Sequence, residues 1–150
     1  MKLNTILLRK GYATVKLKKI NTNHFELKAT LNGIKGRFIL DTGASNSCID
    51  IMLADKFKLQ VEDSDTKAAG AGAIGMDTKI SSQNHIQMKD WKYSNFNVVL
   101  FDLTHVNTAL TEHNANAVDG IIGADILEKG KAIIDYNGKC LYLKKLVFKF

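Results

Sequence analysis

The sequence contains no proline and only two cysteines among its 150 residues. The absence of proline excludes a Pro-rich linker or tail. Cys48 and Cys140 are too few for a disulfide scaffold and have no metal-ligand spacing, so we interpret both as small apolar residues. The four histidines show no metal spacing either, and we expect neither a bound metal nor a cofactor.

The chain also lacks an apolar run long enough to span a bilayer. Residues 1–10 imitate a signal peptide, but the apolar stretch Ile6-Leu7-Leu8 is short and no small-residue cleavage site follows it. We therefore expect a cytoplasmic protein without a membrane partner. A chain whose signal peptide had been removed would look the same.

The net charge of +6 is unevenly distributed along the chain. Residues 1–37 carry nine Lys or Arg against Glu26 alone, and residues 129–150 carry six against Asp135 alone, whereas the middle of the chain is acidic. Neither a nucleic-acid-binding motif nor interleaved aromatic residues accompany the basic termini, so we expect no nucleic-acid partner. We interpret the lysines as solvated side chains on exposed strand faces.

The sequence does contain a series of short strand and turn patterns. Apolar residues alternate with others over 25–31, Asn32-Gly33 interrupts the run, and a second run follows over 34–40. Strand, Asn-Gly, strand is the strongest short-range signal for a β-hairpin, because both turn residues need positive φ. Further strands are predicted over 13–17, 79–89 and 93–103, and a second hairpin of the same type over 131–136 and 140–148.

Two segments are predicted as short helices. The apolar positions of 48–59 fit an amphipathic helix, and 124–129 fits a helical turn that ends at Gly130. Residues 104–117 are rich in Asn and Thr and are predicted as a loop. The expected class is a mainly β barrel or sandwich with one or two short helices.

The length and composition fit a single domain over residues 1–150. Hydrophobic residues make up 45% of the chain, which is enough for a core, and no composition break divides it. We place the core at about 12–145 and a basic N-terminal segment at 1–11.

Asp41-Thr42-Gly43 follows the strongly apolar residues Phe38-Ile39-Leu40, which is an unusual position for a charged side chain. A carboxylate there is expected to be partly buried, and burial is costly unless hydrogen bonds or a partner compensate. Gly43 permits a tight turn, and the Thr42 hydroxyl can donate a hydrogen bond within it. An Asx-type turn at a strand end is the simplest alternative, so the tripeptide alone does not define a function.

A second segment, Asp119-Gly120-Ile121-Ile122-Gly123, holds two β-branched residues between glycines, which suggests close backbone approach to another loop. Together with residues 38–45 it closely resembles the retropepsin-like aspartic proteases, the viral and bacterial single-lobe relatives of pepsin. The resemblance extends from about Val15 to Leu143 and implies a closed acid-protease β-barrel. It also implies site roles: Asp41 as the catalytic carboxylate, Thr42, Gly43 and Ala44 as support for its loop, and Ile121, Ile122 and Gly123 as packing beneath that loop.

Aspartic proteolysis needs two carboxylates that share one proton, and this chain has one Asp-Thr-Gly. Asp119 is the nearest candidate for a second, but no hydroxyl residue follows it and it precedes its apolar residues. The resemblance implies a symmetric homodimer in which each subunit supplies Asp41 and Thr42 forms a hydrogen bond across the two-fold axis. It further implies an aspartic endopeptidase acting on extended peptides or proteins. The alternative is a non-catalytic binding or dimerisation module with the same fold.

The small-residue run 68–75 lies where this family has its flap hairpin. A dinucleotide site is disfavoured although the run spells Gly-x-Gly-x-x-Gly, because no strand precedes it, no helix follows and no βαβ unit surrounds it. A Cys48 nucleophile with His85, His105 or His113 as base lacks any local signature. The predicted flap residues are Gly70, Ala71, Gly72, Ala73, Ile74 and Gly75.

The chain departs from the viral pattern after Gly123. Viral members usually have an Arg there that helps to hold the dimer together, whereas this chain has Ala124-Asp125, which is more typical of the bacterial and cellular branch. A dimer of this chain must therefore be held differently. The C-terminal segment 141–150 is apolar enough to pair with a copy of itself.

Overall fold

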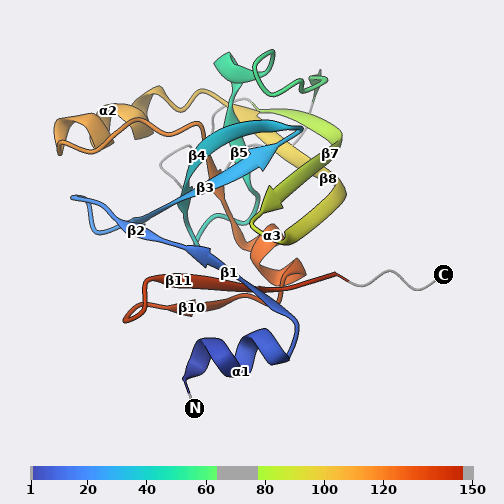
Figure 1. The fold of residues 1–150 in the computed structure, drawn as a ribbon. Helices are drawn as coiled ribbons and strands as arrows, with labels where there is room; N and C mark the ends of the chain where they lie inside the picture. Colours follow the sequence, from blue (N-terminus) through green and yellow to red (C-terminus); the bar gives the residue numbers. More distant parts are fainter. Residues whose placement is uncertain (1, 64–77, 147–150) are drawn as a thin grey trace.

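Two β-sheets and three α-helices form the part of the chain that the computed structural model describes, residues 2–63 and 78–146 (Figure 1). In chain order the elements are α1 (Leu3–Arg9), β1 (Tyr12–Lys16), β2 (Lys18–Lys19), β3 (Phe25–Leu31), β4 (Ile34–Leu40), β5 (Cys48–Asp50), the 3₁₀ helix η1 (Ile51–Leu53), β6 (Glu62–Asp63), β7 (Lys79–Met88), β8 (Trp91–Phe101), α2 (Thr104–Glu112), β9 (Gly120–Ile122), α3 (Ala124–Lys129), β10 (Ile133–Asp135) and β11 (Cys140–Lys144). In these described parts, no helix is long and apolar enough to span a membrane.

The larger sheet closes into a barrel. Its strand order is β2-β3-β4-β9-β5-β8-β7-β6, and a further pairing of β3 with β7 closes the ring. β4 runs parallel to β9 and β5 runs parallel to β8, while β5 and β9 are antiparallel. The predicted mainly β class with a closed barrel is confirmed.

The β3–β4 hairpin forms where the sequence predicts it. Asn32 and Gly33 have φ values of 50° and 85°, as a tight hairpin turn requires. Alternate residues of both strands point into the barrel, and burying one large apolar side chain contributes about 1.5–3 kcal/mol. The inward row is Phe25, Leu27, Ala29, Leu31, Phe38 and Leu40.

A second apolar cluster lies outside the barrel, where α2 covers Ile39 of β4. Leu103 and Leu110 are buried in this cluster and Val106 packs against it, so the apolar residues recur at helical spacing. Asp102 Oδ1 accepts hydrogen bonds from Thr104 N, at 2.8 Å, and from Thr104 Oγ1, which satisfies a free backbone donor at the helix start. The predicted loop over 104–117 is therefore wrong for α2.

Residues 48–59 do not form the predicted amphipathic helix. Cys48–Asp50 is strand β5, which lies between β8 and β9, and only Ile51–Leu53 turns into a short 3₁₀ helix. Asp50 Oδ1 accepts a hydrogen bond from Met52 N at 3.1 Å at the start of that helix. The spacing of apolar residues in so short a run fits either a helix or a strand. Cys48–Asp50 forms a strand because it pairs with β8 and β9.

The smaller sheet has the order β1-β11-β10 and lies beside the barrel, with α1 packed against it (Figure 1). The predicted hairpin of β10 with β11 forms, but its turn differs from the first, because only Lys139 has positive φ there. Both edges of β11 are occupied, since Tyr142 pairs with Thr14 on one side and with Ile133 on the other. The prediction that 141–150 pairs with a second copy is thus wrong for residues 141–144, and 147–150 lie outside the described residues.

Candidate active site

Asp41 lies directly after β4, at the start of a loop of residues 41–47 that we call the Asp41 loop. Asp41 N donates to Ile122 O at 3.0 Å and so continues the β4–β9 pairing by one residue. Gly43 N donates to Asp41 Oδ1 at 2.9 Å, and Ala44 N donates to Asp41 O at 3.2 Å, which closes a tight Asx turn. Asp41 is partly buried, and its Oδ2 accepts no hydrogen bond from the described residues.

Thr42 and Gly43 form the exposed tip of the Asp41 loop. The Thr42 hydroxyl has no hydrogen-bond partner within residues 2–63 and 78–146, so it does not close the turn on itself. Ala44, by contrast, is buried in the cluster that contains Ile121. The loop therefore presents Asp41 and Thr42 outward from an anchored base.

The start of α3 packs against the Asp41 loop. Ala124 N donates to Ala44 O at 2.7 Å, and Gly123 N donates to Ser47 Oγ at 2.8 Å. A Cβ at Gly123 would lie 2.6 Å from Ala44 O and 3.0 Å from Asn46 O, so no side chain fits between these backbones. The close approach expected from the glycines of this segment is present, and the structure brings residues 121–123 against the loop.

Asp125 makes a contact that the sequence reasoning missed. Its Oδ1 accepts hydrogen bonds from Ser47 N at 2.9 Å, Ser47 Oγ at 2.7 Å and Ile126 N at 2.8 Å, and Ser47 is only 2% exposed. The sequence does contain a signal for this contact, namely an acidic residue in the first turn of a predicted helix. Free backbone N–H groups lie in that turn and can donate to a carboxylate. This carboxylate holds the Asp41 loop to α3 within one subunit.

Asp119 lies directly before β9, beside Arg37, at the other end of the β4–β9 pairing from Asp41. Its Oδ2 accepts a hydrogen bond from Arg37 N at 2.9 Å, and its Oδ1 lies 3.6 Å from Lys56 Nζ. Arg37 precedes Asp41 by four strand residues, which at about 3.3 Å per residue is roughly 13 Å. Asp119 and Asp41 therefore do not form a carboxylate pair within one subunit.

Comparison with known proteins places this arrangement in a family. A family model described as aspartyl protease matches residues 27–126, which include the Asp41 loop, β9 and the first turn of α3. The chain belongs to the aspartyl protease family. No curated protein matches its sequence.

Two solved structures resemble this member of the aspartyl protease family. A retropepsin-like aspartic protease from Rickettsia conorii is 18% identical, with 90% of this chain and 91% of that chain covered and a TM-score of 0.61. The retroviral protease-like domain of Ddi1 from Leishmania major is 19% identical, with 81% and 90% covered and a TM-score of 0.57. At these identities the likeness establishes the retropepsin-like fold.

The predicted flap residues of this family member, 70–75, lie outside the described residues. On either side of the gap β6 pairs with β7, so that Glu62 lies opposite Ile80 and Asp63 opposite Lys79. An ion pair joins the Asp63 carboxylate to Lys79 Nζ, and the hydrogen bond from Lys79 lowers the pKa of Asp63 below its usual value. The two ends of the segment are thus held together by a paired β-ladder.

Cys48 does not have the properties of a nucleophile in this fold. It lies on β5 and is 3% exposed, and burial raises the pKa of its thiol to about 12. A thiol with so high a pKa stays protonated near neutral pH, whereas the nucleophile is the thiolate. Among the described residues, no group of three or more His, Cys, Asp or Glu side chains is placed to hold a metal ion.

The Asp125–Ser47 contact leads to a stability prediction. Replacing Asp125 with alanine leaves Ser47 N and Ile126 N without their acceptor, and we expect a loss of about 2–3 kcal/mol in the free energy of unfolding. The Asp125→Asn variant keeps an oxygen in the accepting position and should lose about 1 kcal/mol or less. Urea unfolding followed by tryptophan fluorescence measures both.

Asp55→Ala is the matched control, since Asp55 is exposed and its carboxylate has no partner among the described residues. It should unfold at the wild-type urea concentration. Equal midpoints for Asp125→Ala and Asp55→Ala would contradict a structural role for Asp125.

Proposed function

We propose that this chain is an aspartic endopeptidase whose active site is assembled from two copies of Asp41, one from each subunit of a homodimer. One observation carries the proposal. The backbone of the Asp41 loop is held tightly by Ile122 and α3, while Asp41 Oδ2 and the Thr42 hydroxyl are left without partners among the described residues. A rigid loop with free acid and hydroxyl groups at its tip is suited to meet a second loop.

The need for two subunits follows from the chemistry. Peptide hydrolysis by this class of enzyme requires two adjacent carboxylates with one shared proton, because like charges about 3 Å apart cannot both be ionised. Asp119 is too remote, and Asp125 Oδ1 already accepts three hydrogen bonds. A two-fold axis beside Asp41 supplies the missing carboxylate by symmetry.

The proposed reaction uses one molecule of water. The ionised carboxylate takes a proton from the water as its oxygen attacks the peptide carbonyl carbon, and the protonated carboxyl donates its proton to the carbonyl oxygen. The tetrahedral intermediate then collapses, the C–N bond breaks, and the amine leaves with a proton from the dyad. The Thr42 hydroxyl of each subunit positions the opposite loop by a hydrogen bond across the axis.

The proposed substrate is an extended segment of a peptide or protein. In the family resemblance a flap hairpin covers such a segment, and the ladder of β6 with β7 supports that role because it begins the segment in which we expect residues 70–75 to form the flap. Residues 68–75, which include this predicted flap, are rich in Gly and Ala.

Sedimentation and peptide-library cleavage, measured over the same range of protein concentrations and at several pH values, test this proposal. We expect cleavage per subunit to rise with concentration in parallel with the dimer fraction, and to be blocked by a pepstatin-like inhibitor. A dimer without cleavage at any pH would favour the alternative, a non-catalytic module. Cleavage by a monomer would contradict the shared dyad.

A further inference from the structure

A basic groove lies on the outer face of the barrel, at the opposite end of β4 from Asp41. Its volume is about 1000 Å³, and it runs between β1 and β2 on one side and residues 26–30 of β3 and 35–37 of β4 on the other. Nearer the Asp41 loop, the apolar cluster around α2 covers Ile39, which lies on the same face of β4 as Lys35 and Arg37. The basic residues that line it are Lys16, Lys18, Lys28, Lys35, Arg37 and Lys89.

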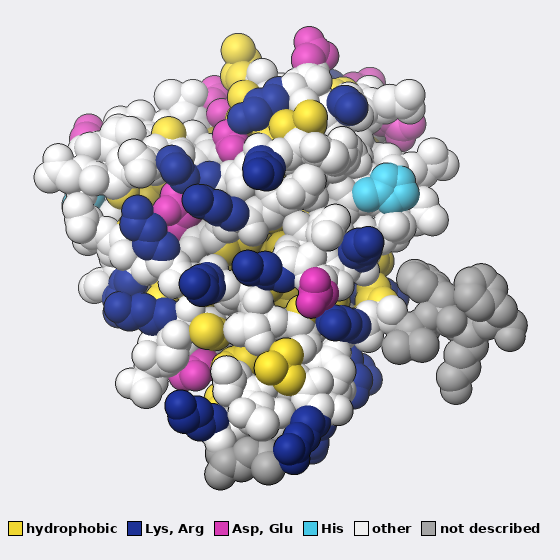
Figure 2. All heavy atoms as spheres, viewed as in Figure 1, with side chains coloured by type: hydrophobic (Ala, Val, Ile, Leu, Met, Phe, Trp, Pro, Cys, Tyr) yellow, Lys and Arg dark blue, Asp and Glu magenta, His cyan; other side chains and the backbone are white. Residues whose placement is uncertain are grey.

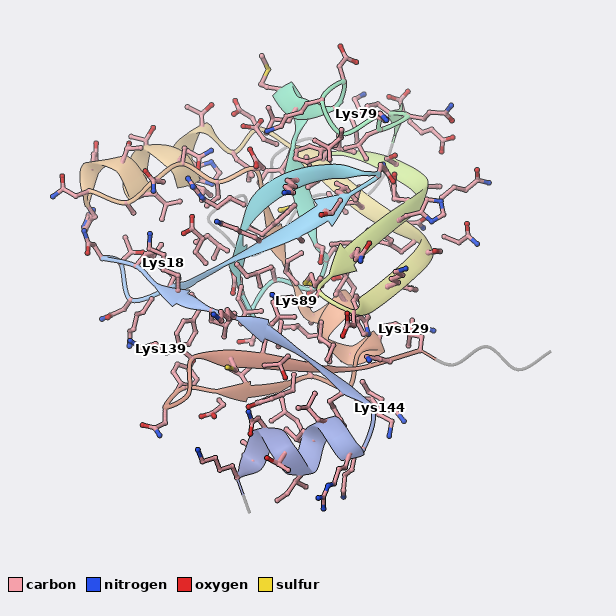
Figure 3. All side chains as sticks on the ribbon, in the orientation of Figure 1. Lys18, Lys79, Lys89, Lys129, Lys139 and Lys144 are labelled. Carbon is pink, nitrogen blue, oxygen red and sulfur yellow. The ribbon has the colours of Figure 1, made fainter. Side chains whose placement is uncertain are left out.

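Lysine and arginine side chains gather on this face with few acidic residues between them, as Figure 2 shows. Figure 3 shows Lys18 on β2 and Lys89 just after β7, at either side of the region between the barrel and β1. The basic residues of the groove come from the four strands β1, β2, β3 and β4 and from the turn after β7. The groove is therefore a product of the fold and not of one basic stretch of sequence.

The two acidic residues in the groove are already neutralised. Glu26 lies 2.8 Å from Arg37 Nε, and Asp119 contacts Lys56 and Arg37 N. Within the described residues, the lysines that line the groove are exposed and form no ion pair, which leaves five unbalanced positive charges.

Like charges are held close together in the groove. Lys28 of β3 lies directly opposite Arg37 of β4, and Lys35 lies two residues before Arg37 on the same face. Because Glu26 already balances Arg37, Lys28 and Lys35 beside it are left as unpaired positive charges that a bound anion can balance. Protection of a sheet edge against aggregation can explain the lysines of the end strand β2. It cannot explain the lysines of β3 and β4, because these strands lie inside a closed barrel.

The lining of the groove favours a polypeptide over a nucleic acid. Among the residues that the structure describes, no aromatic side chain lines it, so bases would have no surface there on which to stack. β2 is the end strand of the larger sheet, and an extended peptide can add main-chain hydrogen bonds to an edge strand. Lys35 and Arg37 are about 7 Å apart along the strand, which matches the spacing of alternate side chains in an extended peptide.

We propose that this groove binds an acidic segment of a polypeptide, as a docking site separate from the Asp41 loop. Binding itself does not require catalysis. Its use, which rests on the proposed endopeptidase function, is to hold protein substrates that carry acidic stretches outside the cleaved segment.

Fluorescence anisotropy with labelled deca-glutamate tests the binding, using the Asp41→Asn protein so that no probe is cleaved. We expect salt-sensitive binding that weakens about tenfold in the double variant Lys28→Gln, Lys35→Gln, because two of the unbalanced charges are lost. The matched control is Lys2→Gln, Lys10→Gln, which removes the same net charge from exposed lysines outside the groove. The control should bind as tightly as the parent.

Three outcomes would overturn the proposal: no binding of deca-glutamate, an equal loss in the control variant, or tighter binding of single-stranded oligothymidylate of the same length. A cleavage measurement separates this proposal from the proposed function. With Asp41 intact, a peptide substrate bearing an acidic extension should have a lower KM than one with a glutamine extension. Deca-glutamate binding without cleavage of any peptide would leave the groove in place and refute the endopeptidase.

Discussion

Replacing Asp41 with asparagine is expected to reduce peptide cleavage by about a thousandfold or more, while the fold and the dimer are retained. The amide cannot take a proton from the attacking water or hold the proton that a dyad shares. Its oxygen can still accept the hydrogen bond that Gly43 N now donates to Asp41 Oδ1, so the turn keeps its geometry. Cleavage rates and sedimentation of wild type and variant measure the effect.

Asp119→Asn is the matched control for this experiment, because it removes the same charge from the other end of the β4–β9 pair. An amide oxygen at position 119 can still accept from Arg37 N, so cleavage should remain within about twofold of wild type. Cleavage that survives Asp41→Asn but is lost in Asp119→Asn would show that the catalytic carboxylate has been wrongly assigned.

Gly120→Ala is expected to destabilise the protein by about 3 kcal/mol or more. Gly120 lies in β9 between β4 and β5, and a Cβ there would be 2.3 Å from Cys48 O and 2.8 Å from Ile49 Cδ1. Cys48 O is backbone, so the clash can be relieved only if two paired strands move apart. Because domains are typically stable by about 5–15 kcal/mol, urea unfolding should show a large shift.

Gly33→Ala provides the comparison, since nothing lies within 4 Å of a Cβ at Gly33. Its φ of 85° still disfavours a side chain, and we expect a cost of about 1–2 kcal/mol from backbone strain alone. A loss in Gly120→Ala no greater than that in Gly33→Ala would show that β5 and β9 can separate without a large loss of stability.

Much of the barrel was predictable from local patterns. The alternation of Phe25, Leu27, Ala29 and Leu31 and the Asn32-Gly33 turn predict β3, β4 and their register, because the side-chain period of a strand is two and the turn sets the pairing. The glycines flanking Ile121-Ile122 predict a close backbone approach, which is now seen at Ala44 and Cys48. In these segments the local signal and the tertiary environment agree.

Other segments could not be predicted because their conformation depends on distant partners. Cys48–Asp50 has apolar residues that fit a helix, yet it pairs with β8 and β9, which lie far along the chain. The Asn and Thr content of residues 104–117 led to the prediction of a loop where α2 forms, although the spacing of Leu103, Val106 and Leu110 is helical. Composition is a weak guide where burial of a few residues decides the structure.

The sequence by itself determined that a carboxylate follows an apolar strand and that only one Asp-Thr-Gly is present, since both are properties of neighbouring residues. Only the tertiary structure decided what holds that carboxylate in place. Ser47 and Asp125 are 78 residues apart, and their contact exists because β4 and β9 run in parallel and deliver the Asp41 loop and α3 to the same end of the barrel. Hydrogen bonds between segments so far apart depend on topology, which no local pattern encodes.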